Sequence, residues 1–567
     1  MRQTTSGSQL TSTPWWNGRG GSHKLAAWIL VLAGCGVQPT NPMDEPRVVA
    51  TVQVEPSLDT LRALGATVQL NAVARDASGD VIDGKTFTWS SSDRDVLTVS
   101  DGGVADARRN GAAIVIAAVD GIEGVATLTV AQAIATVTVE PGSATIDKMG
   151  ETQQFTGVAR DENGHSVNDV QFLWLSSDPG VVTIDPSGVA TARGDGVTTI
   201  TAAGRGLPGH AEVTVALERF VAVSAGADHS CAVTVTGSGW CWGMGQDGRL
   251  GNDAFDDHST PAEVTGEIVF VSISAGGAHS CGLTSAGEAY CWGNGVRGQL
   301  GGNNGGPGSG HPAPVPVTGG HTFVSISSGA RSTCGVTTSG KGYCWGSGTF
   351  GQLGTNSTSD QSTPSPVAGG FTFAAIGTGR DHSCGLTTDG DAYCWGLGRP
   401  DGGGLTQDSV PIPVSGSQTF ESIAVGGSLT CAVTALAEGY CWGEGSAGQL
   451  GNGLMSNSAI PVQVAGGLSF MSITAGRQHA CGLTVGGAAY CWGEGQAGQL
   501  GNGGTSSSLT PVRVSGGVSF TSIDAGRYHT CGVSVSGDAY CWGAGGSGRL
   551  GDGSPVDAPF PVRVPFP

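Results

Sequence analysis

Cysteines at a regular interval constrain this chain most. From residue 220 onward, a cysteine is followed by a second cysteine ten positions later, and this arrangement occurs seven times. Successive pairs begin 50, 53, 50, 47, 50 and 50 residues apart. A period near 50 residues, with several short strands in each repeat, is typical of a β-propeller in which each repeat forms one blade. The cysteines are Cys231, Cys241, Cys281, Cys291, Cys334, Cys344, Cys384, Cys394, Cys431, Cys441, Cys481, Cys491, Cys531 and Cys541.

The sixth repeat shows how four strands fit into one blade. "FMSITAG" (residues 470–476) predicts a first strand, "HACGLT" a second and "AYCWG" a third. "PVQV" (residues 461–464) predicts the outermost strand of the preceding blade. Because proline has no N–H to donate to a neighbouring strand, this "P-V-x-V" segment is expected at an exposed edge.

The spacing of the cysteines fits a hairpin. In "CGLTSAGEAYC", a three-residue turn at 285–287 pairs Thr284 with Glu288 and sets Cys281 opposite Cys291. Directly opposed positions lie close enough for a disulfide, so one disulfide is predicted within each repeat. Such bonds suit an exported protein. The competing interpretation is zinc, which requires four ligands at one point and usually shorter cysteine spacing.

The glycines of the repeat imitate a nucleotide-binding motif. "GNGVRG" has the G-x-G-x-x-G spacing, but the dinucleotide site needs a helix that opens on the last glycine. The residues that follow, "GNNGGPGSGHPAP", cannot form a helix, and the same spacing recurs after "CWG" in five other repeats. We therefore interpret these glycines as turns of the repeat and expect neither a nucleotide nor another cofactor.

Charge excludes one class of partner. The chain has 567 residues and a net charge of -20, with 13% charged residues. Nucleic-acid binding depends on clustered Lys and Arg, so no nucleic-acid partner is expected. The length predicts several domains. No stretch reaches the ~18 apolar residues that a membrane-spanning helix needs.

The N-terminus has the features of an export signal. Basic residues precede the apolar run "LAAWILVLA" (residues 25–33), which Gly34 and Cys35 follow. The segment "LAGC" resembles the lipobox of bacterial lipoproteins. This resemblance implies that residues 1–35 are a signal peptide and that Cys35 carries the lipid. Gly36 stands where many inner-membrane lipoproteins have Asp, which favours the outer membrane or the cell surface.

A duplication follows the linker at residues 36–46. "VEP", "VARD" and "GVA" recur 85 residues apart, without an insertion, and Trp89 corresponds to Trp174. Short alternating runs of Val, Ile and Thr with one central Trp predict two β-sandwiches, at residues 47–131 and 132–217. Both resemble the bacterial Ig-like family, group 2. That resemblance implies a role as spacers or adhesive modules.

The repeats from residue 220 to the end resemble the regulator of chromosome condensation repeats. "AGGAHSCGLTSAGEAYCWGNGVRGQLG" is the clearest example of the motif. The resemblance implies a seven-bladed propeller at residues 218–567, often closed by pairing strands from both chain ends. The last "PVRV" (residues 561–564) ends the chain and is expected to close the ring beside the first repeat. The predicted fold is all-β: two tandem Ig-like sandwiches and then the propeller.

The recurring polar and aromatic residues are expected to be structural. A histidine stands two positions before the first cysteine in five repeats, whereas Ser332 and Leu429 take its place in two. Because the repeat itself places this residue, a hydrogen-bonding role is favoured over a metal site. The "CWG" tryptophans are expected in the core, with exposure at a partner interface as the alternative. The acidic residues show no pairing unique to one blade. The histidines are His229, His279, His382, His479 and His529.

The function expected from these features is recognition without catalysis. A lipid anchor holds the protein at the membrane, the Ig-like pair acts as a spacer, and the propeller binds an unidentified protein or glycan. The alternative is an enzyme or an exchange factor for guanine nucleotides, which the resemblance permits because one member of that family acts on a GTPase. A fold alone does not determine which is correct.

The partner site is expected where the repeat pattern breaks, because binding residues tend to lie on variable loops of a rigid scaffold. The segment at residues 301–317 is three residues longer than its counterparts, and "RPDGGGLTQ" (residues 399–407) replaces "GQLG" in a shorter fourth repeat. The alternative is neutral variation in loop length. The candidate partner-binding residues are Asn303, Asn304, His311, Arg399, Asp401 and Gln407.

Overall fold

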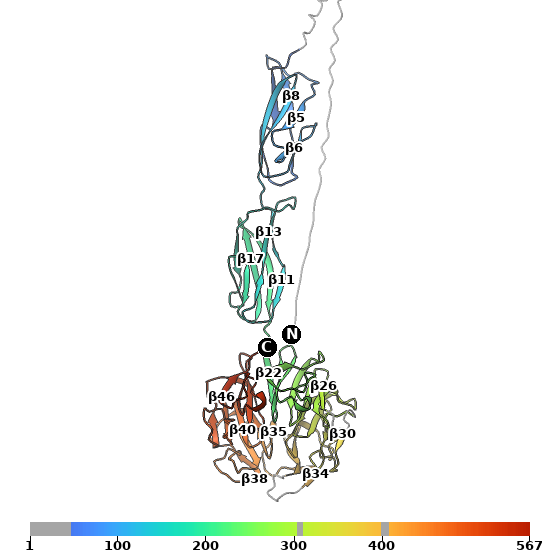
Figure 1. Cartoon of the computed structure of the whole chain (residues 1–567), viewed down its shortest axis with the longest axis vertical. Coiled ribbons are helices and arrows are strands. Elements are labelled where there is room, and N and C mark those ends of the chain that lie inside the picture. Colours follow the sequence, from blue (N-terminus) through green and yellow to red (C-terminus); the bar gives the residue numbers. More distant parts are fainter. Residues whose placement is uncertain (1–46, 303–309, 398–406, 567) are drawn as a thin grey trace, which may run out of the picture. The chain divides into compact units, whose positions relative to one another are not determined.

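The computed structural model describes residues 47–302, 310–397 and 407–566 (Figure 1). In these residues the fold is all-β, with two 3-10 turns, η1 (Gln246–Gly248) and η2 (Gly546–Gly548), as its helical segments. The chain divides into two compact units, which are residues 1–140 with 156–173 and 202–209, and residues 141–155 with 174–201 and 210–567.

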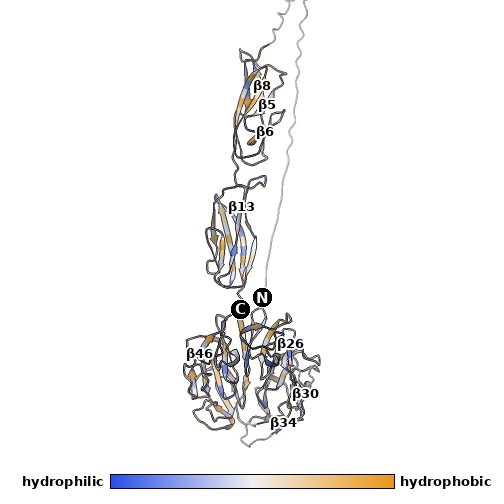
Figure 2. Cartoon of the chain, in the orientation of Figure 1, coloured by the Kyte–Doolittle hydropathy of each residue, from blue (hydrophilic) through white to orange (hydrophobic). Residues whose placement is uncertain are grey.

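The first N-terminal copy forms three sheets, with strand orders β2-β9-β8-β5, β3-β7-β6 and β1-β4. Alternation of apolar and polar residues buries one face of each long strand, so that Val115 and Leu128 lie in a core on which Trp89 packs. Figure 2 shows hydrophobic and hydrophilic residues mixed along the strands. The strands are β1 (Thr51–Glu55), β2 (Leu58–Leu61), β3 (Thr67–Gln69), β4 (Asn71–Arg75), β5 (Thr88–Ser91), β6 (Leu97–Val99), β7 (Val104–Ala107), β8 (Gly111–Val119) and β9 (Ile122–Val130).

The second copy repeats this topology, with orders β11-β18-β17-β14, β12-β16-β15 and β10-β13. The duplication seen in the sequence is therefore a duplication of structure. That the copies are Ig-like domains, and that their boundaries fall at 131 and 217, stay predictions. The strands are β10 (Thr136–Glu140), β11 (Ser143–Ile146), β12 (Thr152–Gln154), β13 (Thr156–Arg160), β14 (Phe172–Ser176), β15 (Val182–Ile184), β16 (Val189–Ala192), β17 (Gly196–Gly204) and β18 (Leu207–Val215).

Seven four-stranded antiparallel sheets follow, one for each cysteine repeat, and we call them blades 1 to 7. Blades 1 to 4 consist of β19 (Phe220–Ala225), β20 (His229–Thr234), β21 (Gly239–Gly243) and β22 (His258–Glu263); β23 (Phe270–Ala275), β24 (His279–Thr284), β25 (Ala289–Asn294) and β26 (Gly310–Pro316); β27 (Phe323–Ser328), β28 (Ser332–Thr337), β29 (Gly342–Gly346) and β30 (Gln361–Pro366); β31 (Phe373–Thr378), β32 (His382–Thr387), β33 (Ala392–Leu397) and β34 (Gln407–Pro413).

Blades 5 to 7 have the same order. They consist of β35 (Ser422–Val425), β36 (Leu429–Val433), β37 (Gly439–Gly443) and β38 (Ser458–Gln463); β39 (Phe470–Ala475), β40 (His479–Thr484), β41 (Ala489–Gly493) and β42 (Ser508–Arg513); β43 (Phe520–Ala525), β44 (His529–Ser534), β45 (Ala539–Gly543) and β46 (Ala558–Arg563). In every blade the proline-containing strand is the fourth and lies at one edge of the sheet, as its missing N–H requires.

The predicted disulfides are present in all seven blades. In blade 2 the turn after Thr284 places Cys281 directly opposite Cys291, and their Cα atoms are 4.0 Å apart. The other six pairs have the same spacing of ten residues and Cα separations of 4.0 to 4.1 Å. Each cysteine is buried, so the bond joins the middle two strands inside the blade.

The ends of the propeller meet differently from the expectation. All four strands of each sheet come from one continuous stretch of chain, and β46 pairs with β45 of its own blade. The first blade contacts the last through β19, which packs on β43 and β44 (Figure 1, green beside red). Pairing of strands from both chain ends is therefore wrong, and packing between complete blades joins blade 7 to blade 1. The last "PVRV" does lie beside the first repeat as expected, because Val564 packs in one cluster with Phe220.

Candidate functional site

The loop that joins the first two strands of each blade contains a glycine, and in blades 1, 2, 6 and 7 it has the pattern "A-G-x-x-H", by which we name this loop in all seven blades. The glycine permits close packing of neighbouring blades. A Cβ on Gly226 would lie 2.5 Å from the carbonyl oxygen of Gly276 in blade 2, and one on Gly526 would meet the carbonyl oxygen of Gly226. The backbone N–H of Ala227 donates to the Gly276 oxygen at 3.1 Å. These contacts run from blade to blade and return from blade 7 to blade 1.

The histidine of this loop also joins neighbouring blades. Nε2 of His229 lies 2.8 Å from the Ser280 hydroxyl of blade 2, and Nε2 of His529 lies 2.8 Å from the Ser230 hydroxyl of blade 1. His279, His382 and His479 make the same contact with a threonine of the next blade. The structural role predicted for the five histidines is therefore confirmed.

Burial keeps these histidines neutral. Desolvation, with a smaller contribution from Arg249, lowers the pKa of His279 to about 3. Desolvation also lowers the pKa of His382 and His479 to about 4, and it places the pKa of His229 and His529 well below the usual value. In the described residues, no group of three or more His, Cys, Asp or Glu side chains is arranged to hold a metal ion.

The tryptophans and the "GQLG" loops form a second contact between blades. Trp292 is fully buried, and its Nε1 donates to the backbone oxygen of Arg249 in blade 1 at 3.0 Å. The Ser280 hydroxyl donates to the same oxygen. The glycine two residues later, Gly251, has a φ of +74° and lies so close to the indole of Trp292 that a Cβ would be 2.7 Å from Nε1. The core role expected for Trp242, Trp292, Trp345, Trp395, Trp442, Trp492 and Trp542 is confirmed by their burial.

A ring of small polar side chains lies on the first strands, one level below the loops. The hydroxyls of Ser224, Ser274 and Ser327 each accept a hydrogen bond from a backbone N–H of the next blade, at 2.8 to 3.1 Å. The hydroxyl of Thr474 does the same between blades 6 and 7. Blades 4 and 5 have Gly377 and Ala424 at this position, so this side-chain contact is missing there.

Blade 7 has a carboxylate in this ring. Asp524 accepts hydrogen bonds from Ser224 Oγ at 3.1 Å and Ala225 N at 2.9 Å in blade 1, and from Thr474 Oγ1 at 2.7 Å in blade 6. Desolvation raises the pKa of Asp524 above its usual value, although the hydrogen bonds favour the charged form. Because Asp524 joins three blades and has no acidic counterpart in the others, the expectation that no acidic residue pairs in a way unique to one blade is wrong.

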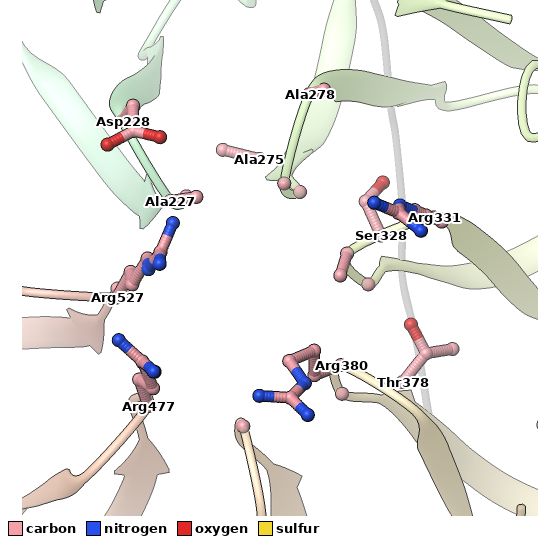
Figure 3. Close-up of a pocket in the computed structure, with 18 of the residues that line it drawn as sticks. Ala227, Asp228, Ala275, Ala278, Ser328, Arg331, Thr378, Arg380, Arg477 and Arg527 are labelled. Atoms are coloured by element: carbon pink, nitrogen blue, oxygen red, sulfur yellow. The ribbon is translucent and has the colours of Figure 1, made fainter. Parts of the chain in front are cut away.

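The "A-G-x-x-H" loops of all seven blades meet around a cavity of about 930 Å³ (Figure 3). The two variable positions of these loops carry six of the eight charged residues of the lining. Four of them are arginines, Arg331 of blade 3, Arg380 of blade 4, Arg477 of blade 6 and Arg527 of blade 7. Figure 3 shows their side chains around the open space.

The charge of the lining is opposite to that of the chain. Six arginines and two aspartates line the cavity, an excess of four positive charges, whereas the whole chain has a net charge of -20. Arg249 and Arg297, the remaining two arginines, are paired with Asp247 and Asp360 at 3.1 Å. Arg380 is paired with its neighbour Asp381 at 2.6 Å.

The other three arginines have no carboxylate partner in the described part of the chain. Arg331 and Arg527 are exposed and Arg477 is half-buried. Arg477 donates to the hydroxyl of Tyr528, and the guanidinium groups of Arg477 and Arg527 lie 5.3 and 4.9 Å from the centre of the Tyr528 ring. The ring of Tyr528 thus orients the guanidinium groups of Arg477 and Arg527 at the cavity.

The candidate partner-binding residues are only partly described. Asn303, Asn304, Arg399 and Asp401 lie outside the described residues, as does Cys35. His311 lies in β26 opposite Gly293, and Gln407 begins β34 opposite Leu397. These two strands are the outermost of blades 2 and 4, and neither residue lines the cavity. Their role in binding stays a prediction.

Comparison with known families decides the nature of the repeats. Residues 194–465 match the RCC1-like domain, and residues 486–533 and 536–567 match the regulator of chromosome condensation (RCC1) repeat. A second RCC1 repeat profile matches residues 472–499 and 520–549. The C-terminal part of this chain is an RCC1-repeat propeller.

Solved structures share the fold of this RCC1-repeat propeller. Prp20p from Saccharomyces cerevisiae is 22% identical, with a TM-score of 0.53, and the match covers 61% of this chain and 88% of that chain. Human WBSCR16 is also 22% identical, with a TM-score of 0.52, over 56% of this chain and 87% of that chain. At this level of identity the likeness concerns the fold alone.

A curated relative matches a shorter part of the sequence. Ice-binding protein 1 of Shewanella frigidimarina (strain NCIMB 400) is 31% identical over 158 residues. The match covers 27% of this chain and 17% of that protein, so the chain spans less than a fifth of the relative's length.

Sequence reasoning missed the arginines of the RCC1-repeat propeller because it searched for differences in loop length. The signal that could have found them is the pair of residues between "AG" and the histidine position. When the seven repeats are aligned, these pairs are Ala-Asp, Gly-Ala, Ala-Arg, Arg-Asp, Gly-Ser, Arg-Gln and Arg-Tyr. Four of the seven contain an arginine in a chain that is poor in cations.

Proposed function

We propose that this chain is a non-enzymatic recognition protein, exported and held at the outer membrane or cell surface by a lipid on Cys35. Its RCC1-repeat propeller binds a partner at the arginine-lined cavity. The observation that carries this proposal is the contrast within the loops. Their glycines and histidines are committed to contacts between blades, whereas the four arginines between them face an open space, and three of these four have no carboxylate partner among the described residues.

The histidines support recognition over catalysis. A general base must be able to take up a proton near the working pH and reach a substrate. Here each histidine is buried, is hydrogen-bonded to the next blade and has a pKa far below neutrality. Nucleotide exchange, the alternative, rests on a fold shared with Prp20p, a protein that binds Gsp1p and histones.

Export is supported by the chemistry of the cysteines. Seven disulfides persist only where the environment is oxidising, and fourteen of the fifteen cysteines are used in them. The remaining cysteine is Cys35 of the lipobox. In the described ranges, no helix is long and apolar enough to pass through a bilayer. The lipid on Cys35 would then supply the anchor.

The duplicated N-terminal copies would act as an Ig-like spacer. Each copy holds its sheets without a disulfide, so its stability comes from the buried apolar residues of its strands. The partial match to Ice-binding protein 1 is consistent with a protein that binds at a cell exterior.

The experiment that tests this function detects the lipid on the chain and the exposure of the propeller at the cell surface. Cells that express the full chain are labelled with a fatty-acid analogue and are then treated with protease while intact. We expect the label on the wild-type chain and not on Cys35→Ser, together with digestion of the propeller in intact cells. An unlabelled chain, or a propeller that the protease reaches only after lysis, would contradict the proposal.

A further inference from the structure

We propose that the arginine-lined cavity binds an extended acidic segment of a polypeptide, whose carboxylates pair with arginines on two opposite sides. This inference rests on the proposed recognition function and names the chemistry of its partner. Arginine suits this task because its planar guanidinium forms two parallel hydrogen bonds with one carboxylate.

The arginines form two pairs. Arg331 and Arg380 come from the adjacent blades 3 and 4, and Arg477 and Arg527 come from the adjacent blades 6 and 7. In a ring of seven blades, these two pairs of loops lie on opposite sides of the cavity. Figure 3 shows Arg477 and Arg527 on one side of the opening, Arg331 on the opposite side, and Arg380 between Arg331 and Arg477.

Small residues separate the two pairs. Blade 5 contributes Gly426 and Gly427 between them on one side. Blades 1 and 2 contribute Ala227, Gly277 and Ala278 on the other. Blade 1 also contributes Asp228, whose carboxylate is paired with Arg549 at 2.9 Å. The loops between the two arginine pairs thus carry small side chains and one neutralised carboxylate, so a chain can cross the cavity from blade 5 to blades 1 and 2 with an arginine pair on each flank.

An extended polypeptide matches this geometry. Successive side chains of a β-strand point to opposite sides, so consecutive acidic residues present carboxylates to both arginine pairs at once. Phe350 is the single aromatic side chain among the described residues that line the cavity. The lining thus gives a sugar ring little aromatic surface on which to stack, which favours a peptide over an anionic glycan.

The electrostatic cost of the arrangement also points to an anionic partner. Arg477 and Arg527 both lie within 5.3 Å of the centre of one tyrosine ring, and Tyr528 supplies only its π-electrons and its hydroxyl. Two like charges at such a separation repel each other until a carboxylate neutralises them. The dipeptide at these positions in blade 5, Gly427 and Ser428, shows that the fold itself does not require arginine there.

The decisive probes are two synthetic octapeptides of equal charge. The first has four consecutive Glu residues flanked by Gly, and the second has Glu and Gly in strict alternation. In an extended conformation the first presents carboxylates to both sides and the second to one side only. We expect the full chain to bind the first at least about tenfold more tightly by isothermal titration calorimetry, since a tenfold ratio is about 1.4 kcal/mol. Binding should weaken as salt increases.

Variants of the chain locate the site. Removing one pair (Arg477→Ala with Arg527→Ala) should reduce the preference between the two octapeptides to less than about twofold, because only one flank remains. Arg513→Ala, which removes an exposed arginine from the outer edge of blade 6, is the matched control and should keep both affinities. Arg477→Lys preserves charge, so a loss of affinity in that variant reports the two-pronged hydrogen bonding rather than charge alone.

Each outcome decides the inference. Equal affinity for the two octapeptides, or binding that survives removal of all four arginines, overturns it. Preference for an oligomer of a uronic acid over both peptides overturns it in favour of a glycan. Circular dichroism of every variant confirms folding before titration, and the lysine variant provides a second measurement if an alanine variant does not fold. The assay uses purified protein, so a chain that binds the peptide but carries no lipid refutes the surface function and leaves this site intact.

Discussion

The same loops build the contacts between blades and the lining of the arginine-lined cavity, but the residues that serve these two purposes are constrained differently. In each "A-G-x-x-H" loop, the glycine touches a carbonyl of the next blade and, in five blades, the histidine bonds a hydroxyl there. The pair of residues between them is different in every blade, and at least one member of each pair lines the cavity. A seven-fold scaffold can therefore carry a site without seven-fold symmetry, because these positions vary more than the positions that make contacts between blades.

This comparison predicts that replacing a buried residue between blades lowers stability strongly, whereas replacing an arginine of the cavity lining lowers it weakly. The largest effect is expected for Trp492→Ala. Trp492 is fully buried and donates to the backbone oxygen of Gln449 at 3.0 Å. Loss of this side chain should lower the free energy of unfolding by about 3–5 kcal/mol, measured by urea denaturation of the full chain. Val485→Ala, at an exposed position of the same blade, is the control, and a loss below about 1 kcal/mol for the tryptophan variant would contradict the prediction.

Removal of one disulfide should rank second. Replacing Cys481 and Cys491 together by serine opens a loop of ten residues, for which the loss of chain constraint is about 2–3 kcal/mol. Denaturation of the variant and of the wild type, both under non-reducing conditions, measures the difference. Peptide mapping of the wild type should recover only pairs that are ten residues apart, and a bond between two blades would contradict the hairpin register.

The buried histidines predict acid sensitivity. The pKa of His479 in the fold is about 4, below its ordinary value of 6.5, so the unfolded chain takes up a proton at pH 5 that the folded chain refuses. Stability is therefore lost as the pH falls below about 6.5. Between pH 7 and pH 5, wild type should lose about 2 kcal/mol more than His479→Gln. Equal slopes for wild type and His479→Gln would refute the assignment.

Substitutions in the ring of side chains on the first strands should change stability by a smaller amount. One substitution should lower stability and another should raise it. Ser224→Ala removes the acceptor for Ala275 N and should lower stability by about 1 kcal/mol. Ala424→Ser adds a hydroxyl where blade 5 lacks one and should raise the denaturation midpoint. Opposite signs for the two variants are the expected result. A loss of stability in both would show that blade 5 has adapted its packing to the missing hydroxyl.

The smallest effect on stability is expected for substitutions of the arginines that line the cavity. Arg331 and Arg527 have no carboxylate partner among the described residues, so Arg331→Ala and Arg527→Ala should each change the free energy of unfolding by less than about 0.5 kcal/mol. Thermal melting of the two variants beside Trp492→Ala places both ends of the comparison on one scale. A loss as large as that of the tryptophan variant would make the arginines structural.

The sequence predicted the parts of the fold that repeat. A tryptophan, a phenylalanine and two cysteines at constant spacing must serve the same purpose in every blade, and hydrophobic burial with hairpin geometry is the simplest such purpose. Strand order within the blade followed from one proline, because only an edge tolerates its missing N–H. These inferences needed contacts of short range, about ten residues along the chain.

The contacts between the first and last blades could not be predicted in this way. Asp524 bonds Ser224, which is 300 residues away, and nothing in its local sequence distinguishes it from the serines at the same position. The arginines present the same difficulty, because Arg331 and Arg527 face one cavity only after seven blades assemble. Differences in loop length were visible in the sequence, whereas convergence of side chains around an axis was visible only in three dimensions.

The disulfide pattern has a consequence for how the protein is made. Each cysteine pairs with its nearest cysteine neighbour along the chain, and the hairpin that aligns the two sulfurs is complete within ten residues. Every bond can therefore form without any residue of the next blade, and a correct bond leaves no free thiol to attack its successors. Local pairing of this kind needs no search among fourteen thiols.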